Sequence, residues 1–149
     1  MLIFQCATSP ATDGDDRNSG QVRLNTAALT YAKQLITDGR VVNDLKGAWA
    51  KDRSSLELEN EFIRQHGFGE YAKWHPGIDD RYAENTKRRY KFPYGDFKNV
   101  HRCGVLAAKA RARQYNRADI ESAATELISL IESQRSESGR ALPHSTTWP

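Results

Sequence analysis

The stretch KRRYKFPYGDFKNVHRCGVLAAKARARQYNR, residues 87–117, decides how the rest of this chain is interpreted. It contains ten basic residues and one acidic residue, so it carries a formal charge of +9. Of the 22 basic and 19 acidic residues in the chain, 12 and 18 lie elsewhere, which leaves the remainder at −6. Such segregation of charge bears on the partners of a protein rather than on its fold.

Within this stretch, a helix is predicted over about 97–115, with Asp96 as its N-cap. When its residues are placed at 100° intervals, the apolar and small side chains occupy one side. The opposite side is a basic stripe of four residues: Lys98, Arg102, Lys109 and Arg113. His101 and Arg111 project from the apolar side instead. Both are therefore expected to be largely buried in a polar network, hydrogen-bonded to a carboxylate or a backbone carbonyl.

A second helix is predicted over about 117–134, because its apolar residues recur at helical spacing. These residues are Ile120, Ala123, Ala124, Leu127, Leu130 and Ile131. The connection between the two helices is short, and a short connection favours an antiparallel helix pair.

Further helix signals precede the basic stretch. Asn25 or Thr26 can cap a helix over about 26–38. Ser54 and Glu57 form a capping box for an acidic helix that ends at Gly67, and a short aromatic helix follows it. The fold class expected is therefore mainly α, a small helical domain with a C-terminal antiparallel helix pair and flexible ends.

Three segments follow from these predictions. Residues 1–25 are expected to form a flexible N-terminal arm, 26–134 the helical domain and 135–149 a flexible C-terminal tail, because both ends are polar and lack apolar periodicity. A length of 149 residues is compatible with one domain and tails.

Several function classes find no support in the sequence. There is no run of 18 apolar residues, so no membrane span is predicted. The two cysteines, Cys6 and Cys103, are expected to be reduced thiols in a cytoplasmic protein. The histidines and Cys103 lack paired ligand spacing, so no metal site is predicted. No cofactor-binding motif and no set of catalytic residues is recognised, which leaves an enzyme as the least supported hypothesis.

The charge pattern favours a binding protein. Cations on one face, with Tyr90, Phe92 and Tyr94 between them, can contact phosphates and unpaired bases without strong sequence specificity. An acidic protein surface is the alternative partner, in which case the protein is an adaptor. Ion pairs with the acidic half of the chain could instead neutralise the face internally. The residues predicted to bind nucleic acid or another anion are Lys87, Arg88, Arg89, Lys91, Lys98, Arg102, Lys109 and Arg113.

The order YAKWH, then GID, then TKRRYKFPYGDF and VHR resembles a family of small bacterial proteins that has no established activity. The resemblance covers roughly residues 55–133. It implies a small, soluble bacterial protein, and it transfers no catalytic residue to this chain.

Overall fold

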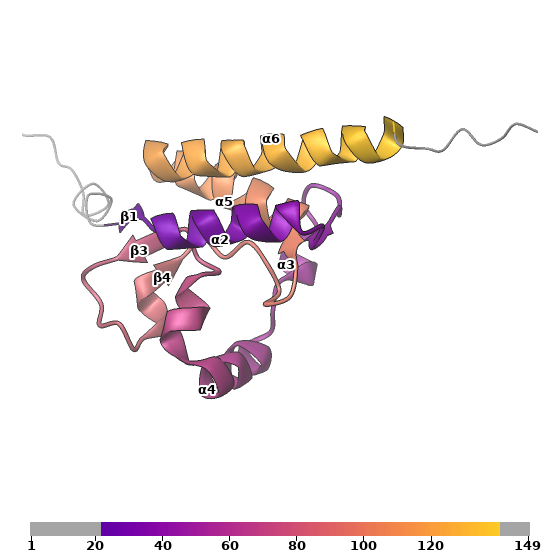
Figure 1. Cartoon of the computed structure of the whole chain (residues 1–149). Helices are drawn as coiled ribbons and strands as arrows, with labels where there is room; N and C mark the ends of the chain where they lie inside the picture. The colour runs from indigo at the N-terminus through magenta and orange to yellow at the C-terminus, as the bar shows by residue number, and fades with distance from the viewer. Residues whose placement is uncertain (1–21, 141–149) are drawn as a thin grey trace, which may run out of the picture.

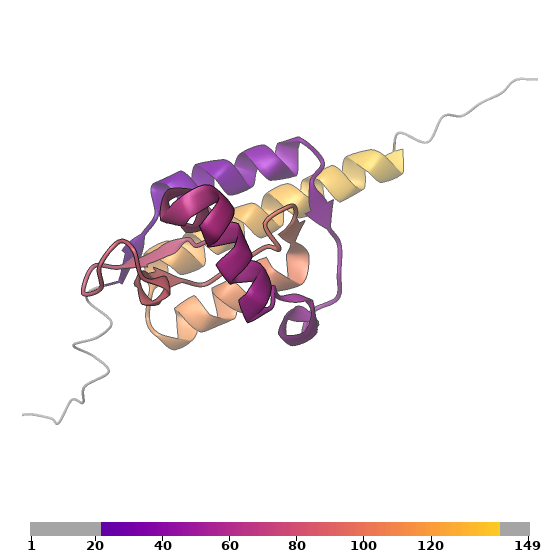
Figure 2. The ribbon, with the colours of Figure 1, turned by 90° about the horizontal axis from the view of Figure 1, so that it is seen from below.

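The computed structural model describes residues 22–140, and helices dominate it (Figure 1). The prediction of a mainly α-helical domain is confirmed. Helix α6 packs against α5 and α2, while α4 lies on the opposite side of the molecule from α6 (Figures 1 and 2). The helices are α2 (Thr26–Thr37), α3 (Trp49–Asp52), α4 (Leu56–Ala72), α5 (Arg102–Gln114) and α6 (Ala118–Arg140).

Two small sheets connect segments that lie far apart in the sequence. The first is antiparallel, in the order β1 (Val22–Leu24), β3 (Gly77–Asp79) and β4 (Tyr90–Lys91). The second pairs β2 (Val41–Val42) with β5 (Val100–His101) in parallel. Strand β1 lies inside the predicted N-terminal arm. Its pairing with β3 therefore extends the ordered part of the chain to Val22.

Helix α2 begins where the sequence predicts, because Asn25 accepts a hydrogen bond from the amide of Ala28. The same side chain is buried and donates to the carbonyls of Ala72 and His75, at 2.9 and 3.0 Å. Asn25 therefore caps α2 and also ties it to the end of α4.

We expect Asn25→Ala to lower the free energy of unfolding by about 2 kcal/mol, since it removes a cap and leaves two carbonyls without their donor. Asn25→Asp keeps the cap acceptor but turns a buried carboxylate oxygen toward the two carbonyls, so it should lose at least as much stability as Asn25→Ala. Urea denaturation of the three proteins measures both values. Equal stability of the Asp variant and the wild type would contradict the tie to α4.

Helix α4 corrects the predicted capping box by one residue. Ser55, and not Ser54, accepts from the amide of Leu58. Gly67 interrupts the helical backbone with a φ of 83°, so two helical segments meet there at a bend. The predicted helix end at Gly67 and the short aromatic helix after it are both consistent with this bend.

The predicted helix over 97–115 begins five residues later than expected, at Arg102. Asp96 does not cap it. Its carboxylate accepts from the amides of Lys98 and Asn99 in a tight turn instead. Pairing of β5 with β2 keeps Val100 extended, and Phe97 has a φ of 69°, so the segment cannot be helical. The tertiary pairing overrides the helical pattern.

Helix α6 continues to Arg140, six residues past the predicted end. A polar composition excludes burial of these residues but does not prevent a helix, and Arg135 forms an ion pair with Glu132 one turn away. Most of the predicted N-terminal arm, residues 1–21, and residues 141–149 of the predicted tail lie outside the described residues.

The core lies between the helices and the turn 94–101. Trp74 and Tyr94 are its largest side chains, and their ring centroids are 5.6 Å apart. Apolar side chains of α2, α5 and α6 complete it: Ala32, Leu35, Ile36, Val105, Ala124, Leu127 and Ile131. Among the described residues, no helix has the length and apolar character that crossing a membrane requires.

Candidate anion-binding groove

A groove of about 800 Å³ runs between one side of α5, the segment around α3 and the strands β3 and β4. Apolar residues such as Pro93, Ala107 and Ala108 form part of its lining. We call it the cationic groove because five of its lining residues are basic. These are Arg53, Arg81, Lys91, Arg111 and Arg117.

Within residues 22–140, Asp79 is the one carboxylate that lines the groove, and it is fully buried and already paired. Arg81 donates to it through two nitrogens, at 2.8 and 2.6 Å, and Lys91 Nζ lies 3.9 Å away. The Arg81 guanidinium holds the pKa of Asp79 below its ordinary value, so this group is ionised at neutral pH. Four positive charges remain after it is counted against the five cations.

Three of the arginines have no carboxylate partner among residues 22–140: Arg53, Arg111 and Arg117. Arg117 donates to the carbonyl of Val22 at 2.6 Å, and its buried Nε has no hydrogen-bond partner in the described part of the chain. The Arg111 guanidinium lies 5.7 Å from the centre of the Tyr115 ring. These three guanidinium groups therefore carry positive charge that no carboxylate of residues 22–140 pairs with.

Aromatic rings form part of the same lining: Trp49, Tyr90, Phe92 and Tyr115. Phe92 adopts a φ of 66°, which is a rare conformation for a bulky residue. The Phe92 ring packs so closely on Gly77 that a Cβ added at Gly77 would lie 2.6 Å from Phe92 Cδ2. A strained residue that surrounding structure holds in place is a feature of functional sites.

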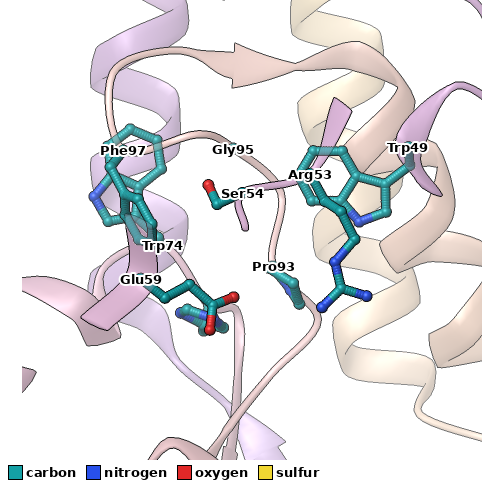
Figure 3. Close-up of a pocket in the computed structure, with 9 residues that line it drawn as sticks. Trp49, Arg53, Ser54, Glu59, Trp74, Pro93, Gly95 and Phe97 are labelled. Carbon is teal, nitrogen blue, oxygen red and sulfur yellow. The ribbon is translucent and has the colours of Figure 1, made fainter. Parts of the chain in front are cut away.

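A much smaller cavity of about 10 Å³, room for one water molecule, adjoins the groove (Figure 3). Trp49, Arg53 and Pro93 line both. The hydroxyl of Ser54 is buried there without a hydrogen-bond partner among the described residues. Figure 3 places Trp49 and Arg53 on one side of this cavity and Trp74 and Phe97 on the other.

The groove is not the surface predicted from the sequence. Of the eight predicted binding residues, Lys91 alone lines it. Lys87 pairs with Glu59 at 3.0 Å, Arg89 with Asp80 at 2.9 Å and Arg102 with Glu132 at 2.7 Å. Arg88 lies over the Tyr82 ring. Part of the basic stretch is therefore neutralised by carboxylates that lie outside it in the sequence.

The basic stripe is also shorter than predicted. Lys98 precedes α5 and lies in the turn, so it cannot continue a helical row. Lys109 and Arg113 lie on α5, and neither has an ion-pair partner within the described range 22–140. They remain candidate anion contacts on the side of α5 that carries Arg102.

His101 and Arg111 lie in different environments. His101 is buried, with Nδ1 2.7 Å from Asp44 and Nε2 2.9 Å from Asp96. Arg111 is exposed and lines the groove rather than lying in the interior expected for it. Arg111 therefore belongs to a second charged surface, opposite the basic stripe. Its position outside the stripe was the sequence signal for this surface, whereas no local sequence feature indicates that Arg53 or Arg81 lines the groove.

The fold also assembles metal-ligating groups that no sequence spacing suggests. Ligand atoms of Asp44, Asp52, His101 and Cys103 all lie within 4.8 Å of one another. We call these four residues the Asp–His–Cys cluster. They come from the segment before α3, the end of α3, the end of β5 and the start of α5.

Comparison with known protein families, curated proteins and solved structures gave no match to this chain. The resemblance seen in the sequence therefore stays an expectation.

Proposed function

We propose that this protein binds single-stranded nucleic acid in the cationic groove, without strong preference for base sequence. The observation that carries the proposal is the gathering of five cationic side chains around one carboxylate that is already paired. Phosphates supply the charge that such a surface lacks, and their contacts dominate the affinity of nucleic-acid-binding proteins.

The aromatic rings favour unpaired bases over a duplex, because bases can stack on them only when unpaired. Tyr115 is 41% exposed and already carries the Arg111 guanidinium near its ring. A base can stack on Tyr115 while Arg111 contacts the adjacent phosphate. Arg53 and Arg117 supply further phosphate contacts.

Among the described residues, no asparagine or glutamine lines the groove. Bidentate contacts from these amides read adenine, so the described lining offers no adenine-reading side chain of this kind. The groove therefore matches a protein that follows the backbone of a strand.

We also propose which helices hold the groove residues in place and in which cellular compartment the protein works. We take α5 and α6 as an antiparallel pair, because only Tyr115–Arg117 separates them, and this pair would hold Arg111 and Tyr115 in place. The thiol of Cys103, the one cysteine among residues 22–140, is hydrogen-bonded to Asp44, and we place the protein in the reducing cytoplasm as the sequence predicts.

We expect the double variant Arg53→Glu/Arg111→Glu to lower the affinity for a short labelled oligonucleotide at least about tenfold at low salt. Each lost phosphate contact should also reduce the slope of log affinity against log salt by roughly 0.7. Fluorescence anisotropy over a salt series measures both. The matched control is Lys109→Glu/Arg113→Glu, which changes the net charge equally on another side of α5.

Four outcomes would contradict the proposal in different ways. Equal losses in both double variants would mean that binding follows net charge and not the groove. A loss confined to the control would move the site to the predicted helix face. Binding of polyglutamate as tightly as the oligonucleotide, or no binding of the oligonucleotide at all, would favour an acidic protein as the partner.

A further inference from the structure

We propose that the Asp–His–Cys cluster binds a divalent transition-metal ion of the zinc class. Asp44, Asp52, His101 and Cys103 supply one ligand atom each, all within 4.8 Å of one another. The inference does not depend on the proposed binding of nucleic acid.

Two pairs of the ligand atoms are joined by hydrogen bonds. Asp44 Oδ2 lies 2.7 Å from His101 Nδ1 and 2.8 Å from Cys103 Sγ. Around a zinc ion with bonds of about 2.0 to 2.3 Å, ligand atoms stand roughly 3.5 Å apart. Replacing two shared protons with one metal ion therefore requires these side chains to separate by less than about 1 Å.

Asp96 completes the arrangement that metal-binding histidines usually have. His101 Nε2 lies 2.9 Å from Asp96 Oδ2, and the amides of Lys98 and Asn99 hold Asp96 in place. A carboxylate on the far nitrogen fixes the tautomer and leaves Nδ1 free for the metal. His101 is buried, so its ring is already oriented toward Asp44.

The carboxylates of the site outnumber its one basic side chain, His101, which lies within ion-pair distance of Asp44 and Asp96. Three carboxylates, those of Asp44, Asp52 and Asp96, surround one imidazole and one thiol. No lysine or arginine forms an ion pair with any of the three within the described part of the chain. A hydrogen-bond network that only caps α5 needs Asp44 alone, since Asp44 Oδ1 accepts from the amide of Cys103.

The ligand types select among metals. Thiolate and imidazole favour zinc and similar ions, whereas magnesium and calcium prefer oxygen ligands alone. A cysteine or histidine must be deprotonated at the atom that binds the metal, so binding releases the Cys103 proton, and any proton on His101 Nδ1, to the solvent.

Cobalt and zinc, added alone to the metal-free full chain, test the inference. With Cys6→Ser as the background, so that Cys103 is the only thiol, cobalt should show intense visible bands and a thiolate charge-transfer band. Zinc should then displace cobalt and raise the Tm. Asp96→Asn keeps an acceptor for the two turn amides and should weaken zinc binding about 10- to 100-fold, as loss of an outer-shell partner does.

Cys103→Ser should abolish the charge-transfer band, and Asp52→Asn should lower the zinc affinity even if the serine variant folds poorly. The matched control is His66→Gln, because His66 is exposed on α4 and lies outside the cluster. A cobalt spectrum without a thiolate band would overturn the proposal. So would zinc binding that Asp52→Asn and Asp96→Asn leave unchanged, or that His66→Gln removes.

Discussion

Replacement of Gly95 by alanine is expected to lower the free energy of unfolding by about 3 kcal/mol, the upper end of the cost of overpacking a core. A Cβ at this position would lie 2.5 Å from the carbonyl oxygen of Asn99 and 2.6 Å from Trp74 Cζ3. Neither neighbour can move easily. The Asn99 carbonyl accepts from the amide of Asp96 within the tight turn, and Trp74 is 2% exposed among other aromatic rings.

Thermal and urea denaturation measure this effect, and Gly69→Ala is the matched control. A Cβ at Gly69 meets nothing within 4 Å, and the residue lies in the last turns of α4. Alanine is the better helix former by up to about 1 kcal/mol, so the control should keep or slightly raise the stability. Equal losses in the two variants would show that the turn does not pack on Trp74 as described.

Protonation of His75 should destabilise the fold as the pH falls. The side chain is 2% exposed, and burial lowers its pKa from 6.5 to about 4, against a smaller opposing effect of the Tyr71 carbonyl 2.9 Å from Nδ1. The unfolded chain takes up this proton near pH 6.5, whereas the folded chain takes it up only near pH 4. The stability is therefore complete above pH 6.5 and declines between the two values, by about 3 kcal/mol at pH 4.

The comparison with His75→Gln isolates this contribution, because glutamine can still donate to the Tyr71 carbonyl but does not titrate. Between pH 7 and pH 4 the wild type should lose about 3 kcal/mol more than the variant, since carboxylates shared by both proteins cancel in the difference. His66→Gln, at an exposed position of α4, should follow the wild-type profile. Parallel profiles of the wild type and His75→Gln would show that His75 is not buried in the neutral form.

The helices were largely predictable, because the interactions that start and stop a helix lie within a few residues. Asn25 caps α2 through an amide three residues away, and Gly67 bends α4 through its own backbone. The start of α5 was not predictable. Its helical pattern extends back to Phe97, but pairing of β5 with β2, about sixty residues earlier in the chain, keeps Val100 and His101 extended.

The binding residues show the same division. The sequence by itself determined that positive charge gathers in residues 87–117 and that Arg111 does not belong to the basic stripe. Only the tertiary structure decided which charges meet acids, as Lys87 meets Glu59, and which line the groove with Arg53. Whether a charge is paired depends on partners from distant segments, and a pattern along one helix cannot contain that information.

The Asp–His–Cys cluster is the clearest case of what the tertiary structure decided. Ligand spacing in a sequence reveals a metal site only when the ligands share one helix, turn or hairpin. Here Asp44 and Asp52 lie more than forty residues from His101 and Cys103 in the sequence. Pairing of β2 with β5 brings the two parts of the chain together at the cluster. The sequence determined the local elements. The packing of those elements placed the cluster, since burial and long-range pairing act between side chains that are distant along the chain.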